Sequence, residues 1–119
     1  MKVVAYKIKY FMNKKVKQIL VELKSELVNH LENDIQEIIL FGSHINNDNN
    51  DESDLDILIV LKSSYDWKKK RMLRDVCYDI GLKHDILIDS KIISNYELNN
   101  TLKGIHPLYK DAIEKGIRA

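Results

Sequence analysis

The segment from Leu55 to Leu61 constrains the fold of this chain most strongly. Its last five residues, Ile57 to Leu61, are all apolar. Because successive side chains of a strand point to opposite faces, such a run is apolar on both faces. A strand of this kind lies in the middle of a sheet that is covered on both sides. The sequence therefore predicts an α/β (α+β) arrangement, in which helices flank one small mixed sheet.

The rest of the chain supplies the other elements of such a fold. Apolar residues at intervals of three and four predict amphipathic helices, and short β-branched runs predict strands. The predicted order is a helix over residues 13–33, a strand over 35–41, the central strand over 55–61, a helix over 67–82, a third strand over 84–88, and weaker helices over 91–102 and 108–115. A chain of 119 residues suits a single core. We expect one domain over residues 12–119, with residues 1–11 as an extension outside the fold, because Met12 offers a second start.

The overall composition excludes some classes of protein. The formal net charge is only +1, whereas a protein that binds long nucleic acid through a broad basic surface neutralises many phosphates. No apolar stretch approaches the roughly 18–20 residues that cross a bilayer. Cys77 is the only cysteine, which excludes an internal disulfide and indicates a reducing compartment. We expect a cytoplasmic protein that binds neither long nucleic acid nor a membrane.

Gly42 and Ser43 are candidates for binding a phosphate group. They directly follow the predicted strand over 35–41, where we expect a helical turn to open. Glycine lets the backbone approach a phosphate without a Cβ in the way, and serine adds a hydroxyl donor. The N-terminus of a helical turn contributes free N–H groups and a partial positive charge, which suit an anion.

Asp54 and Asp56 stand at the start of the central strand. Residues two apart on a strand face the same side and lie roughly 6.6 Å apart along it, so both carboxylates point into one space. Two ionised carboxylates repel each other, and a divalent cation between them removes the conflict. Oxygen ligands favour Mg²⁺, with Mn²⁺ as the alternative. The pair therefore predicts a metal site.

Asp85 is expected to open the third strand, over residues 84–88. An acid at the start of a buried strand is costly unless it has a role. If this strand lies beside the central one, Asp85 completes a three-carboxylate site that holds two metal ions. Asp89, on the same strand face as Asp85, is interpreted as the solvent-exposed end of the strand, with a supporting place beside the metal ligands as the alternative.

Together, Leu40-Phe41-Gly42-Ser43, Asp54-Leu55-Asp56 and Asp85 resemble the DNA polymerase β-type nucleotidyltransferase superfamily. The likeness is greatest to its minimal nucleotidyltransferase (MNT) branch, in which Gly-Ser is followed about ten residues later by Asp-x-Asp and then by a third acid. The tail, over residues 106–109 and 114–117, also resembles this branch. The likeness thus extends over residues 35–117.

This resemblance implies a nucleotidyltransferase fold and an enzyme that transfers a nucleoside monophosphate, foremost AMP from ATP, to a hydroxyl group. By the same resemblance, Gly42 and Ser43 hold the triphosphate, and Asp54 and Asp56 bind the metal ions. Asp85 binds one metal and helps to deprotonate the acceptor. MNT proteins are often encoded beside a helical HEPN partner, and several are antitoxins that attach AMP to a tyrosine of that partner. A HEPN protein is thus the expected partner, and a homo-oligomer is left open.

The chain departs from the family just after Ser43. Many relatives carry basic residues there, whereas this chain has the segment HINN at 44–47. Lys62, Lys68 and Lys69 are candidates to replace the missing positive charge. The departure leaves a second hypothesis open, namely a binding module that neutralises its partner by steric contact without turnover. Transfer to a small molecule such as an aminoglycoside is a third hypothesis, which the short chain disfavours.

Overall fold

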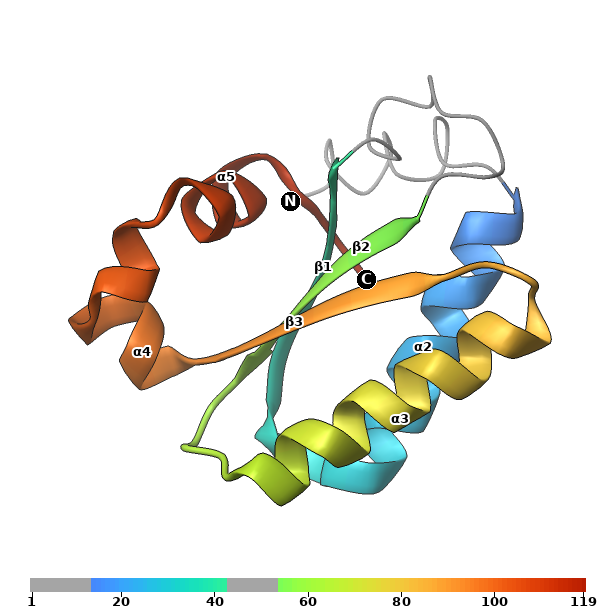
Figure 1. Ribbon diagram of the computed structural model, residues 1–119, viewed down its shortest axis with the longest axis horizontal. Helices are drawn as coiled ribbons and strands as arrows, with labels where there is room; N and C mark the ends of the chain where they lie inside the picture. The colour runs from blue at the N-terminus through green and yellow to red at the C-terminus, as the bar shows by residue number, and fades with distance from the viewer. Residues whose placement is uncertain (1–13, 43–53) are drawn as a thin grey trace.

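The computed structural model describes residues 14–42 and 54–119. They form a four-stranded sheet between two layers of helices (Figure 1). The elements are, in chain order, α2 (Lys14–Leu31), η1 (Glu32–Asp34), β1 (Ile35–Phe41), β2 (Leu55–Leu61), α3 (Trp67–Lys83), β3 (Ile88–Ser94), α4 (Asn95–Asn100), η3 (Leu102–Ile105), α5 (Pro107–Lys115) and β4 (Ile117–Arg118). The predicted class, a small mixed sheet flanked by helices, is confirmed.

Strand β2 lies in the interior of the sheet, whose strand order is β3-β2-β1-β4. It pairs antiparallel with β1 and parallel with β3, and β4 pairs antiparallel with the other edge of β1. Every residue of β2 except Asp56 is completely buried. The prediction of a covered central strand is therefore confirmed, and Asp56 is its one polar residue.

Two separate apolar cores lie on the two faces of the sheet. Helices α2 and α3 pack on one face, where residues such as Leu23, Ile57 and Leu73 form the larger core. Helices α4 and α5 lie on the opposite face (Figure 1). The smaller core on that face consists of Ile39, Leu58, Val60, Ile93 and Ala112. Side chains along β2 alternate between the two cores, so Asp56 lies on the face of α4 and α5.

The third strand begins later than the sequence predicts. Strand β3 spans Ile88–Ser94 instead of residues 84–88, and the expectation that Asp85 opens it is wrong. Residues 84–87 form the turn that ends α3, where the N–H of Ile86 donates to the carbonyl of Gly81 at 2.9 Å. Asp85 has a φ of 55° there, a left-handed conformation that Asp adopts more readily than most residues. The helix end therefore uses the residues that had been assigned to the strand.

The C-terminal segments correct one further prediction. The helix predicted over 91–102 is shorter, because residues 91–94 belong to β3 and α4 spans only Asn95–Asn100. The last helix begins at Pro107, which occupies its first turn, and ends at Lys115. The two-residue strand β4 was not predicted. No helix within residues 14–42 and 54–119 is long and apolar enough to cross a membrane, and the predicted extension over 1–11 lies outside the described residues.

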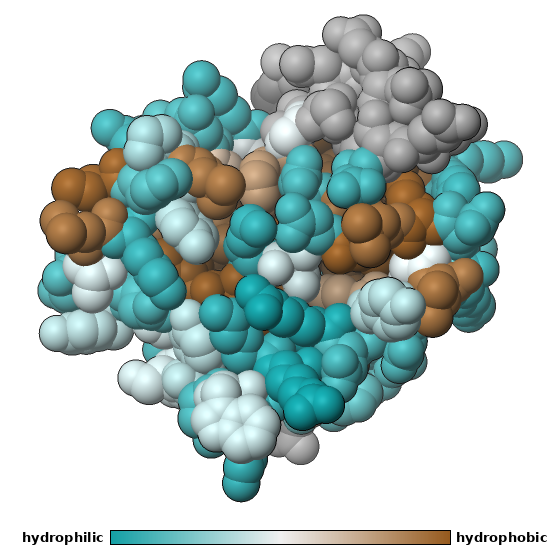
Figure 2. All heavy atoms as spheres, in the orientation of Figure 1, coloured by the Kyte–Doolittle hydropathy of each residue, from teal (hydrophilic) through white to brown (hydrophobic). Residues whose placement is uncertain are grey.

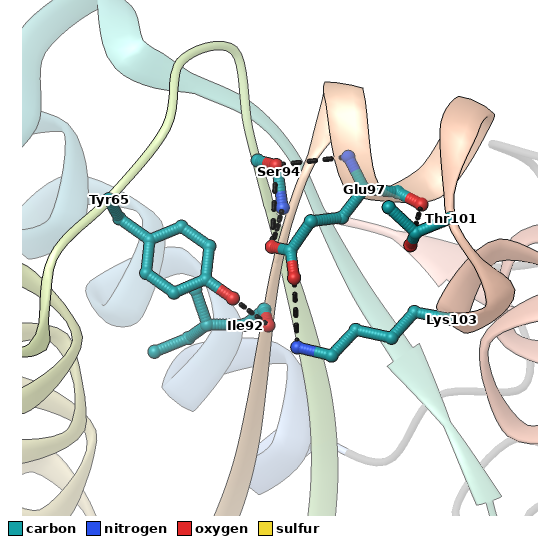
Figure 3. A network of polar contacts seen from close by, with 6 residues as sticks. All are labelled: Tyr65, Ile92, Ser94, Glu97, Thr101 and Lys103. Atoms are coloured by element: carbon teal, nitrogen blue, oxygen red, sulfur yellow. Dashed lines mark hydrogen bonds and ion pairs between the residues drawn. The ribbon is translucent and has the colours of Figure 1, made fainter.

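A polar network joins α4 to its neighbours (Figure 3). The Ser94 hydroxyl accepts from the Glu97 N–H at 3.1 Å, and the Glu97 carboxylate accepts from the Ser94 N–H at 3.1 Å, which forms a capping box. Lys103 of η3 lies 2.9 Å from the same carboxylate. The Tyr65 hydroxyl donates to the carbonyl of Ile92 at 3.2 Å. Burial acts to raise the pKa of Glu97, but hydrogen bonds from Lys103, Tyr65 and Ser94 outweigh it and lower the pKa to about 2.

Candidate active site

Asp56 and Asp89 lie opposite each other on neighbouring strands. In the parallel pairing of β2 with β3, the two residues are register partners. Both are half-buried. Both belong to the face of α4 and α5, since Leu58 and Ile93, an even number of residues further along each strand, lie in the core of that face. Adjacent strands are about 4.8 Å apart, so the two carboxylates are close enough to share a cation.

Asp54 comes directly before β2 and is exposed. It adjoins the segment 43–53, which lies outside the described residues. This segment includes Ser43, the predicted phosphate-binding serine. Across residues 14–42 and 54–119, no three His, Cys, Asp or Glu side chains are grouped closely enough to hold a metal ion. The described part of the site is therefore the pair Asp56 and Asp89, with Asp54 next to it in sequence.

Gly42 brings backbone directly against this carboxylate pair. It follows β1 at the point where Phe41 is the register partner of Asp56. Its φ is +81°, and a Cβ added to it would collide with the Oδ2 atom of Asp56 and lie 3.1 Å from the Cγ atom. Only glycine meets both conditions without strain. The sequence predicts that Gly42 lets the backbone approach a phosphate, and the structure shows in addition that Gly42 leaves room for the carboxylate of Asp56.

Asp85 does not lie in the pairing that brings Asp56 and Asp89 together. It is exposed, and it lies in the turn before β3. Asp89, which the sequence indicates as the solvent-exposed end of a strand, lies instead near the start of β3, opposite Asp56. A signal for it was present in the sequence. Residues 88–92 alternate between small or apolar and charged, with Asp89 and Lys91 as the charged positions, and this two-residue period is typical of a strand.

The positive charge nearest to the described carboxylates in sequence and fold is Lys91. It is two residues beyond Asp89 on the same face of β3, and its Nζ atom lies 3.3 Å from Oδ1 of Asp89. The three lysines proposed from the sequence lie elsewhere, and Lys68 is in the first turn of α3 with its Nζ atom 5.8 Å from the ring centre of Trp67. Lys62 follows the opposite end of β2, with its N–H bonded to the carbonyl of Asp34, and Lys69 forms an ion pair with the Asp34 carboxylate.

The donor set of this face suits a hard divalent cation. Carboxylate oxygens are the ligands that Mg²⁺ and Mn²⁺ take in proteins, and two carboxylates in register repel each other unless a cation lies between them. Asp56 also makes polar or electrostatic interactions with its surroundings. The residues present therefore fit a metal held by Asp56 and Asp89, with Asp54 available from the adjoining segment.

The surface of the molecule is divided into polar and apolar areas. Figure 2 shows hydrophilic side chains across the middle of one face, with hydrophobic groups on either side of them. The exposed large apolar residues include Leu82 and Leu87 around the end of α3, and Leu102 and Ile105 in η3. The first pair flanks a hollow of about 280 Å³ that is also lined by Tyr78. The hollow is also lined by Ile88, a residue of the larger core, so this apolar area lies on the side of α3.

Comparison with known proteins shows the family of this chain. The family model described as Polymerase beta, Nucleotidyltransferase matches residues 14–112. The chain belongs to this nucleotidyltransferase family. The match includes Gly42, Asp54, Asp56 and Asp89, so the elements that carry the carboxylates are those of the family domain. As a member of the family, the chain is a nucleotidyltransferase-like enzyme, and enzymes of this class generally use divalent metal ions.

Individual relatives of this nucleotidyltransferase come from archaea. Two proteins of Methanocaldococcus jannaschii, each named a putative protein adenylyltransferase, align over most of their length. One is 35% identical over 71 residues, which is 60% of this chain and 72% of the relative. The other is 36% identical over 83 residues, which is 69% of this chain and 75% of the relative. A crystal structure of a nucleotidyltransferase candidate from Sulfolobus solfataricus gives a TM-score of 0.40 at 22% identity, covering 83% of this chain and 80% of that one, and carries no information on function.

Proposed function

We propose that this protein transfers a nucleoside monophosphate, most simply AMP from ATP, to a hydroxyl group of another protein. The observation that carries the proposal is the pairing of Asp56 with Asp89 on one face of the sheet. The backbone of Gly42 lies directly against the carboxylate of Asp56. Paired carboxylates beside a phosphate-binding turn are what metal-dependent phosphoryl chemistry requires.

The residues divide the work as follows in this proposal. Asp54, Asp56 and Asp89 hold the metal, with two Mg²⁺ ions as the expected number and Mn²⁺ as the alternative. Asp89 takes the role that the sequence assigned to Asp85, because Asp89 is the acid in register with Asp56. Gly42 and Ser43 bind the triphosphate. Bound metal ions supply charge neutralisation on the phosphates and activate an attacking hydroxyl.

The acceptor in this proposal is a protein. The two archaeal relatives are named for adenylyl transfer to proteins. A tyrosine on a HEPN-type partner is the acceptor that the resemblance to the MNT branch favours, in which case the chain is the antitoxin of a toxin–antitoxin pair in the cytoplasm.

Label transfer tests the proposal directly. The protein is incubated with ATP labelled at the α-phosphate, Mg²⁺ and the protein encoded by the neighbouring gene. We expect the partner to become labelled, and we expect Asp56→Asn and Asp89→Asn to lower the rate at least about 100-fold, since even residues that only support metal ligands change activity 10–100-fold. Asp85→Asn is the matched control, an exposed aspartate four residues from Asp89. It should keep the wild-type rate.

Two results would contradict parts of this proposal. If the wild-type protein transfers no label to any protein, the proposed transfer reaction is disproved. If Asp85→Asn loses activity while Asp89→Asn keeps it, Asp85 and not Asp89 is the third carboxylate of the site.

A second candidate function is a binding module without turnover. The uncharged segment 44–47 favours it, because this segment lacks the basic residues that many relatives place after Gly-Ser. Calorimetry with ATP and Mg²⁺ separates the two functions. A module binds the partner tightly and shows no heat of nucleotide binding, whereas the enzyme binds ATP in the absence of the partner.

A further inference from the structure

Lys91 is a half-exposed cation on the face that carries the carboxylate pair. Its side chain is 35% exposed and pairs with Asp89, whose side chain is 45% exposed. Its register partner on β2 is Leu58, one of the apolar residues that floor this face. Lys91 therefore stands between the carboxylates and the apolar core, where any ligand lying along this face from Asp56 would meet it.

The other basic side chains of the described sheet and its connections are paired with other groups or lie far from Asp56 and Asp89. Arg118 lies on the same face but donates to the carbonyls of Ile113 and Gly116 and lies 3.5 Å from Glu37. Lys103 pairs with Glu97 in the network around α4. Lys62 follows Leu61, five residues along β2 from Asp56, which is roughly 17 Å at the rise of an extended strand. Lys91 is the cation that the fold places next to the acids.

Lys91 lies close enough to Asp89 to contact any ligand that shares a metal ion with this aspartate. Oxygen ligands lie about 2.1 Å from a Mg²⁺ ion, so two ligands of one ion are at most about 4 Å apart. The Lys91 Nζ atom is already 3.3 Å from Oδ1 of Asp89. We propose that Lys91 binds a phosphate group of the nucleotide and supplies the positive charge that the segment after Ser43 lacks. This inference rests on the proposed nucleotidyl transfer and names one residue of its nucleotide site.

Lys91 also has a defined place when no nucleotide is bound. Its ammonium group then neutralises part of the charge of Asp89, which otherwise faces the carboxylate of Asp56 across the strand pair. Metal alone must compete with this ammonium group, whereas metal that arrives with a triphosphate offers the lysine a new anionic partner. Removal of the lysine charge should therefore change the two affinities in opposite directions.

The experiment measures both affinities in the folded, full-length protein. Mn²⁺ binding without nucleotide is followed by electron paramagnetic resonance, and Mg²⁺-ATP binding by calorimetry. For Lys91→Met we expect about tenfold weaker binding of Mg²⁺-ATP, from the loss of one hydrogen bond between charged groups. We expect Mn²⁺ alone to bind up to about threefold more tightly, because a half-exposed ion pair no longer competes. Lys91→Arg should keep the affinity for ATP within about threefold.

Lys103→Met is the matched control. It also removes a partly exposed lysine that is paired with a carboxylate, at a distance of 2.9 Å, but its partner Glu97 belongs to α4 and not to the site. It should leave both affinities unchanged.

The outcomes separate this inference from the proposed function. A Lys91→Met protein that binds Mg²⁺-ATP as tightly as wild type overturns the role of Lys91 and leaves nucleotidyl transfer standing. A parallel loss of Mn²⁺ and Mg²⁺-ATP binding also overturns it, because Lys91 would then support metal binding instead of competing with the metal for Asp89. Wild-type protein that binds no Mg²⁺-ATP overturns both.

Discussion

Gly42 shows how one residue fixes the geometry of the site. Its φ of +81° lies in the left-handed region, and its missing side chain leaves the space that the Asp56 carboxylate occupies. Backbone strain and collision are separate penalties for any other residue at this position. They can be separated by experiment, because Asn adopts a positive φ more readily than Ala but still carries a Cβ.

We predict that Gly42→Ala lowers the free energy of unfolding by about 1–3 kcal/mol, the usual cost of a residue held in a sparsely populated conformation. It should also abolish Mn²⁺ binding, because its Cβ displaces the Asp56 carboxylate. Gly42→Asn should regain part of the stability and none of the metal binding. Urea unfolding and Mn²⁺ titration measure these effects. Metal affinity that follows stability in both variants would disprove the collision.

The candidate site could be predicted in part at this scale. Asp54 and Asp56 are recognisable because their two-residue spacing places them on one side of a strand, and Gly42 is recognisable because it directly follows the predicted strand over 35–41. Asp89 could not be identified in the same way, because its partnership with Asp56 depends on which residue of β3 faces which residue of β2. A shift of register by one residue would turn Asp89 to the other face, and no local pattern fixes that register.

At the scale of elements, the local period of apolar residues was a good guide. It predicted β1 and β2 at the bounds Ile35–Phe41 and Leu55–Leu61, and it predicted α2 and α3 to within a few residues. It failed at β3, because the turn that ends α3 contains Ile86 and Leu87, whose apolar character imitates a strand. The chain must complete the hydrogen bonds at the end of α3 before it can extend.

The junction between β3 and α4 depends on an ionised Glu97. Its lowered pKa, about 2 against an ordinary value of 4.5, means that the folded state favours the charged form. A carboxyl of this kind stabilises the fold fully above pH 4.5, and this contribution is lost as the pH falls from 4.5 towards 2.

We predict that Glu97→Gln makes the protein less stable than wild type at pH 7 and reduces the dependence of its stability on pH between 4.5 and 2. Urea unfolding at several pH values measures this, and the two curves should converge at low pH. Asp111→Asn, a change at an exposed carboxyl of α5, is the control and should keep the wild-type dependence on pH. Parallel curves of stability against pH for wild type and Glu97→Gln would show that the network around Glu97 does not stabilise the ionised form of its carboxyl group.

On the scale of the whole molecule, the two faces of the sheet have different tasks. The face of α2 and α3 carries the larger apolar core and most of the buried residues. The face of α4 and α5 carries a smaller core together with Asp56, Asp89 and Lys91. Most of the apolar packing that stabilises the sheet therefore lies on the face of α2 and α3, and the candidate site lies on the face of α4 and α5.

We predict that Mg²⁺-ATP raises the free energy of unfolding by about 2.7 kcal/mol when its concentration is 100 times its Kd, since it binds the folded state alone. Thermal unfolding with and without the ligand measures the shift, and EDTA should reverse it. Asp56→Asn should show no shift, whereas the Asp85→Asn control should behave like wild type. An equal shift in Asp56→Asn would place the ligand elsewhere on the molecule.

The parallel pairing of β2 with β3 also has a consequence for the life of the newly made chain. Antiparallel neighbours such as β1 and β2 can meet as soon as both have been synthesised, but β3 reaches β2 only after the whole of α3 has crossed the sheet. A ribosome-bound chain that ends before Ile88 therefore contains the Gly42 turn and the DxD motif and still lacks the strand that completes the carboxylate pair. Premature termination within α3 should therefore yield fragments that lack the pairing of Asp56 with Asp89.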